Sequence, residues 1–69
     1  MKYKIKAVVL EKVGAEFKYF THRYHIEAEN DEEAKKETLH LVAVLFSKGI
    51  RVVYHHIFKT VGYHEVEVH

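Results

Sequence analysis

Histidine is the residue type in this sequence that is best suited to chemistry, because an imidazole can bind a metal ion or transfer a proton near neutral pH. The 69 residues include seven histidines and no cysteine. His22, His56 and His64 are predicted on the helix side of three different strands, where three imidazoles could bind zinc if they converged. The predicted strand order places another strand between His22 and His56, so we expect no metal site.

The sequence offers no activated nucleophile and no phosphate-binding loop. Ser47 is the only serine, and it lies near the end of a predicted helix. Carboxylates lie beside histidines near the end of the sequence, where Glu65 and Glu67 are next to His64 and His69. All three glycines take turn or cap positions, so none belongs to a glycine-rich phosphate loop. We therefore expect no catalytic residue, no cofactor and no enzymatic activity.

Residues 31–48 are predicted to form the only helix. Asn30 or Asp31 can cap its N-terminus, and Glu33 lies at capping-box distance from Asn30. Gly49 can adopt the left-handed conformation that ends a helix. One stripe of side chains at helical spacing should face a core: Ala34, Thr38, Leu41, Val42 and Leu45.

The second half of this helix carries more apolar residues than one core-facing stripe requires. Leu39, Ala43, Val44 and Phe46 lie outside the stripe. A helix that is apolar nearly all round is usually covered on more than one side. Either strand ends and loops of the same chain cover it, or a second chain does so through Leu39, Ala43 and Phe46.

Alternation of apolar and polar residues predicts four strands: Lys2–Leu10, Phe17–Ala28, Ile50–Lys59 and Tyr63–Val68. The helical crossover makes the second and third strands parallel. If those two strands flank the first, every neighbouring pair is antiparallel and the order is 2-1-3-4. The predicted fold class is α+β: a β-β-α-β-β two-layer sandwich in which one helix packs on a four-stranded antiparallel sheet. Residues 1–69 would form a single domain.

This fold leaves one sheet face without cover from the chain. In the third strand, simple alternation turns Arg51, Val53, His55, Ile57 and Lys59 away from the helix. The uncovered face would be a solvated surface, a protein interface or a path for nucleic-acid phosphates. Its candidate partner-binding residues are Tyr19, Arg23, His25, Val53, His55 and Ile57.

Length and composition bound the remaining possibilities. A chain of 69 residues buries a small fraction of its surface, and without disulfides oligomerisation is one remaining way to stabilise it. The net charge of +1 gives no general attraction to nucleic acid. No apolar run approaches the roughly 20 residues that span a bilayer, and the N-terminus does not resemble a signal peptide. We therefore expect a cytoplasmic protein.

Two resemblances are present. The stretch Tyr24–Thr38, YHIEAENDEEAKKET, resembles a strand-to-helix joint common in small phage and mobile-element proteins. The layout is also similar to archaeal ribosomal proteins of the LX kind, in which a hairpin with a Phe-Thr pair, here Phe20 and Thr21, precedes an acidic helix start. That family has a basic segment after its helix, where this chain carries only Lys48 and Arg51.

The leading functional hypothesis is a small non-enzymatic protein-binding module that acts as a homodimer. It would be an inhibitor or regulator of phage type that masks the surface of a host protein. The alternative is RNA binding by a basic sheet face through five residues: Lys2, Lys4, Lys6, Arg23 and Arg51. A pH response or a metal response of the histidines is a third possibility.

Overall fold

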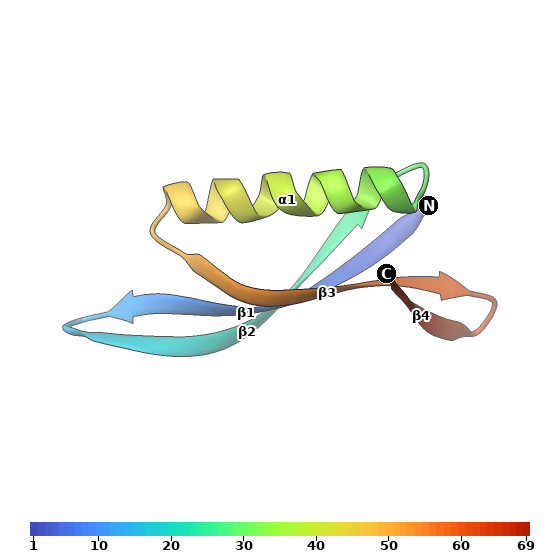
Figure 1. Cartoon of the computed structure of the whole chain (residues 1–69). Coiled ribbons are helices and arrows are strands. Elements are labelled where there is room, and N and C mark those ends of the chain that lie inside the picture. Colours follow the sequence, from blue (N-terminus) through green and yellow to red (C-terminus); the bar gives the residue numbers. More distant parts are fainter.

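Four strands and one helix follow one another in the predicted order, as Figure 1 shows. This computed structural model describes residues 1–69. The sheet has the strand order β2-β1-β3-β4, and every neighbouring pair is antiparallel. The α+β layout with one helix on a four-stranded sheet is therefore confirmed. The elements are β1 (Lys2–Val13), β2 (Glu16–Glu27), α1 (Asp31–Ser47), β3 (Arg51–Val61) and β4 (His64–Val68).

Both ends of α1 are fixed by the residues that predicted them. The Asn30 side chain accepts a hydrogen bond of 2.9 Å from the backbone N–H of Glu33. Gly49 has a φ of 84°, and its N–H donates to the Phe46 carbonyl. The N–H of Ile50 donates to the Leu45 carbonyl at 2.9 Å, which completes a Schellman motif.

The core lies between α1 and the inward side of β1. Alternate β1 residues, Tyr3, Ile5, Ala7 and Val9, are all buried, as their spacing predicted. The helix buries Ala34, Thr38 and Leu45 against the sheet. The hydroxyl of Thr38 donates to the Ala34 carbonyl at 2.8 Å, so this buried polar group is satisfied within the helix.

A β-bulge in β3 changes which face its side chains take. Val9 of β1 pairs with Val52, whereas the preceding residue, Val8, pairs with Tyr54. Val53 is therefore an extra residue that has no partner in β1. Because side chains alternate with a period of two, one extra residue moves every later side chain to the opposite face.

The predicted faces of residues 54–59 were wrong for this reason. Ile57 pairs with Ile5 on the helix side and is only 6% exposed, so it belongs to the core. His55 pairs with Ala7 on the same side and is half-buried. The side chains that take their place on the uncovered face are those of Tyr54, His56 and Phe58.

The molecule is elongated. It measures 45 × 21 × 16 Å, and its radius of gyration is 13.1 Å, against about 11 Å for a compact domain of this length. In Figure 1 the β1–β2 hairpin extends well beyond the end of α1. The accessible surface is 5217 Å², whereas a compact protein of this mass exposes roughly 4,500 Å². No helix has the length and apolar character needed to cross a membrane.

Candidate binding surface on the open sheet face

The open face, by which we mean the sheet side away from α1, presents rows of side chains that run across the strands. One row consists of Arg23, Lys6 and His56, on β2, β1 and β3 respectively. The neighbouring row toward the end of β3 holds His25, Lys4, Phe58 and Glu67. The two rows on the other side hold Thr21, Val8 and Tyr54, and then Tyr19, Leu10 and Arg51.

Two cations face each other on this surface without a counterion. Lys6 and Arg23 are direct cross-strand partners and both are exposed. Neither takes part in any of the ion pairs of the structure. Like charges directly opposite one another destabilise a sheet. An anion bound between the two side chains would remove that repulsion.

Lys4, by contrast, is already neutralised. Its ammonium forms an ion pair with Glu65 and lies 5.9 Å from the ring centroid of Phe58, within range of a cation–π interaction. The pair reaches from β1 across β3 to β4. Lys4 therefore attaches the short β4 to the rest of the sheet.

Aromatic rings follow β3 along the open face. The rings of Tyr54 and His56 have centroids 5.7 Å apart in an edge-to-face arrangement, and those of His56 and Phe58 are 6.3 Å apart. His56 Nδ1 lies 3.1 Å from a Glu67 carboxylate oxygen. Tyr54 is 55% exposed, which leaves its ring accessible to a planar ligand.

A second row of the same type lies on the helix side of β2. Phe20, His22 and Tyr24 have consecutive ring centroids 6.2 Å apart, and His22 Nε2 lies 3.1 Å from a Glu11 carboxylate oxygen. Alternation predicted that each row shares one face, and the bulge moves the β3 row from the helix side to the open face. Neither row was predicted as a binding feature, although aromatic-x-His-x-aromatic occurs at 20–24 and again at 54–58.

The residues predicted for partner binding separate into groups. Tyr19, Arg23 and His25 lie on the open face as expected. Val53 lies in the bulge and is 49% exposed. His55 and Ile57 do not belong to this surface, because the bulge turns them toward the helix. The helix surface predicted for a second chain consists of Leu39, Ala43 and Phe46. These residues are exposed, but they lie on the helix layer and not on the open face of the sheet.

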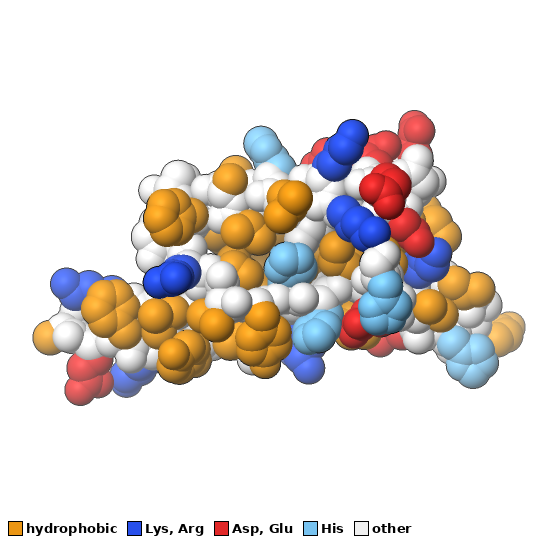
Figure 2. Space-filling view, in the orientation of Figure 1, with side chains coloured by type: hydrophobic (Ala, Val, Ile, Leu, Met, Phe, Trp, Pro, Cys, Tyr) orange, Lys and Arg blue, Asp and Glu red, His pale blue; other side chains and the backbone are white.

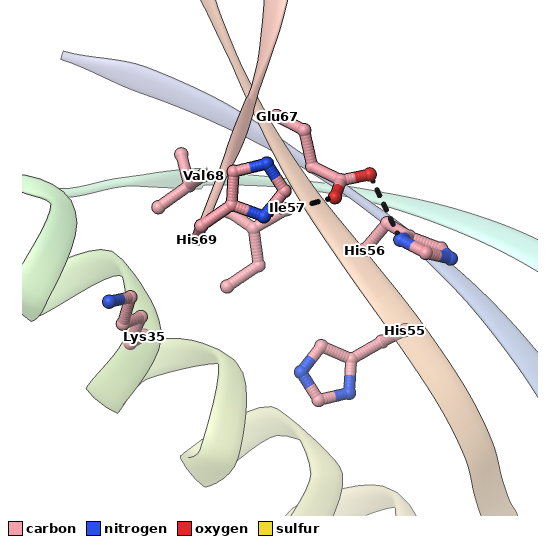
Figure 3. A pocket seen from close by; sticks show the side chains of 7 residues that line it. All are labelled: Lys35, His55, His56, Ile57, Glu67, Val68 and His69. Atoms are coloured by element: carbon pink, nitrogen blue, oxygen red, sulfur yellow. Dashed lines mark ion pairs between the residues drawn. The ribbon is translucent and has the colours of Figure 1, made fainter.

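A pocket of about 340 Å³ opens between α1 and the β3–β4 edge. Figure 3 shows the Glu67 carboxylate between His56 and His69, with Lys35 on the helix at the opposite side of the pocket. The oxygens of Glu67 lie 3.1 Å and 3.4 Å from the Nδ1 atoms of these two histidines. No three His, Cys, Asp or Glu residues are placed to share a metal ion.

A polar cluster ties the two layers together. The Asp31 carboxylate accepts hydrogen bonds from the Tyr3 hydroxyl at 2.8 Å and from Lys59 Nζ at 2.9 and 3.1 Å. The bonds from Lys59 and then Tyr3 lower the pKa of Asp31. Burial, followed by the bond to Asp31, raises the pKa of Tyr3. Since every polar group of the cluster is engaged within the chain, its role is structural.

Comparisons with protein-family models, curated proteins and solved structures find no match to this chain.

Proposed function

We propose that the chain is a non-enzymatic binding module whose open sheet face binds single-stranded nucleic acid. The observation that carries this proposal is the direct cross-strand pair of Lys6 and Arg23, which has no counterion, beside the aromatic row of β3. Phosphates neutralise such cations. Unpaired bases stack on exposed aromatic rings such as that of Tyr54.

The distribution of charge supports a polyanion on this face despite the net charge of +1. Asp31, Glu32 and Glu33 gather at the start of α1, on the opposite layer, where Figure 2 shows acidic side chains clustered. At this position the positive end of the helix dipole stabilises the acidic groups. On the open face, Glu65 and Glu67 are engaged with Lys4 and His56. The open face keeps the unpaired cations Lys6, Arg23 and Arg51 close to the rings of Tyr19 and Tyr54.

The test is a titration of fluorescently labelled oligouridine and oligothymidine, measured by fluorescence anisotropy over a salt series. The Lys6→Gln/Arg23→Gln variant should bind weakly, and its salt slope should be smaller by about 1.4, because single strands give roughly 0.7 per phosphate contact. The matched control is Lys36→Gln/Lys48→Gln, which removes two exposed cations from the helix layer.

Tyr54→Ala separates stacking from charge. It should weaken binding by about 1–3 kcal/mol per stacked base without changing the salt slope. If Lys6→Gln/Arg23→Gln and its control Lys36→Gln/Lys48→Gln lose affinity equally, charge attraction is not confined to the open face. The assignment of binding to that face would then fail. Comparison of the two oligonucleotides shows whether a 2′-hydroxyl matters.

A protein partner is the second candidate, and a separate surface supports it. Leu39 and Phe46 are 63% and 69% exposed on α1, and exposed apolar patches often mark protein interfaces. An inhibitor that masks a host protein would use this helix surface. Capture of a protein by the wild type, lost in Leu39→Glu/Phe46→Glu but retained in Lys6→Gln/Arg23→Gln, would assign that activity to the helix.

A further inference from the structure

Part of β3 has an open edge. β4 pairs only with Ile57–Val61, so the segment Arg51–His56 has no strand on the side opposite β1. We call this segment the free edge of β3. Figure 1 shows β4 beside only the C-terminal end of β3. Unpaired backbone N–H and C=O groups along such an edge are a template for another strand.

An apolar stripe of α1 overhangs this free edge. Leu39, Val42, Ala43 and Phe46 are spaced so that they share one side of the helix. Lys35 precedes Leu39 by one helical turn, on the same side, and it lines the pocket together with residues of β3 and β4. The stripe is therefore on the β3 side of the helix. Figure 2 shows apolar side chains on the helix above others that follow the strands.

We propose that the free edge of β3 pairs antiparallel with the same edge of a second copy of the chain. This arrangement has two-fold symmetry, because antiparallel pairing brings identical segments together. The two sheets become continuous, and the two apolar helix stripes pack against each other above the new junction. Hydrogen bonds thus come from the sheet layer and apolar burial comes from the helix layer.

The ends of the free edge fit a second copy. An incoming strand must stop where β4 begins to pair, opposite Ile57. In the antiparallel arrangement, Arg51 of the second copy lies opposite His56. Because β3 starts at Arg51, the partner strand ends there and does not meet β4. The bulge increases the local twist of β3. Two identical copies have the same twist, so the paired edges still follow each other.

The exposed area is sufficient for such a dimer. The chain exposes 5217 Å², which is roughly 700 Å² more than a compact protein of this mass. A standard stable interface removes about 800 Å² from each partner. The excess therefore has the size of one side of an interface.

The other edge of the sheet is less suited to pairing. The outer edge of β2 carries charged residues along its whole length: Glu16, Lys18, Arg23 and Glu27. Charged side chains on an edge discourage pairing with another strand. The free edge of β3 holds only one permanently charged residue, Arg51, and no helix stripe faces β2 in the same way.

Self-association is measured by light scattering or sedimentation over a concentration series, with 8.2 kDa as the mass of one chain. The wild type should have twice this mass. Leu39→Lys, on the exposed helix stripe, and Val53→Lys, on the free edge, should each weaken the dimer by roughly 30-fold or more, as central interface substitutions do. The control is Tyr19→Lys, which changes an exposed aromatic residue on β2 and should leave the mass unchanged.

Amide hydrogen exchange locates the interface independently of mass. Amides within the free edge should be protected in the wild-type dimer and should lose protection in Leu39→Lys, a variant whose fold is checked by circular dichroism. A monomer at all concentrations, or a dimer in which Arg51–His56 exchange freely, would overturn the proposal. Nucleic-acid binding is measured separately, so either proposal can fail without the other.

Discussion

The Asp31 carboxylate lies 2.8 Å from the Tyr3 hydroxyl, and this hydrogen bond joins the start of the helix to the central strand. Asp31 has a lowered pKa, first because of its bond with Lys59. Tyr3 has a raised pKa, first because it is buried. The two shifts predict losses of stability at opposite ends of the pH range.

At low pH, the unfolded chain takes up a proton at Asp31 before the folded chain does, so stability should fall below about pH 4. At high pH, the unfolded chain releases the Tyr3 proton first, so stability should fall above about pH 10. Melting temperatures across pH test this. Asp31→Asn should flatten the acid limb of the curve and Tyr3→Phe the alkaline limb. Unchanged limbs in these variants would show that other groups govern the pH response.

Ile57 and Val53 should respond in opposite ways to substitution, although alternation predicted the same face for both. Ile57→Ala should lower the free energy of unfolding by about 2–4 kcal/mol, because it leaves a cavity in the core. Val53→Ala should cost less than about 1 kcal/mol, since that side chain is half exposed. Urea denaturation measures both. Equal costs would contradict the assignment of their environments.

The difference between these residues shows what the sequence could predict. The helix ends could be predicted because Asn30 and Gly49 are local signals that act within one turn. The inward side of β1 could be predicted because apolar residues occupy alternate positions. In β3, apolar residues occur at both odd-numbered and even-numbered positions, as Val52 and Val53 do. The pattern therefore could not reveal a one-residue bulge, which depends on pairing with β1.

Deletion of Val53 should preserve the fold. Val52 and Tyr54 already pair with Val9 and Val8, so removing the extra residue restores a regular ladder. Deletion of Ala7 from β1 should instead unfold the chain, because β1 pairs on both sides and has no extra residue to absorb the loss. Side chains on one side of the gap would then turn to the wrong faces. Circular dichroism and melting of the two deletion variants make the comparison. A folded Ala7 deletion together with an unfolded Val53 deletion would contradict the register.

Arg23→Glu should raise stability and reduce nucleic-acid binding at the same time. In the free protein it replaces a like-charge cross-strand pair with a Lys6–Glu pair, which should add about 0.5 kcal/mol to the free energy of unfolding. In the complex it removes one phosphate contact and adds repulsion.

A substitution that merely damaged the fold would lower both quantities, so the opposite directions identify a surface arranged for an anionic ligand. Arg51→Glu is the matched comparison, because Arg51 is also an exposed cation of the open face but its cross-strand partner, Leu10, is uncharged. It should weaken binding without the gain in stability. A stability gain of equal size in both variants would show that general charge balance, and not the Lys6–Arg23 repulsion, is responsible.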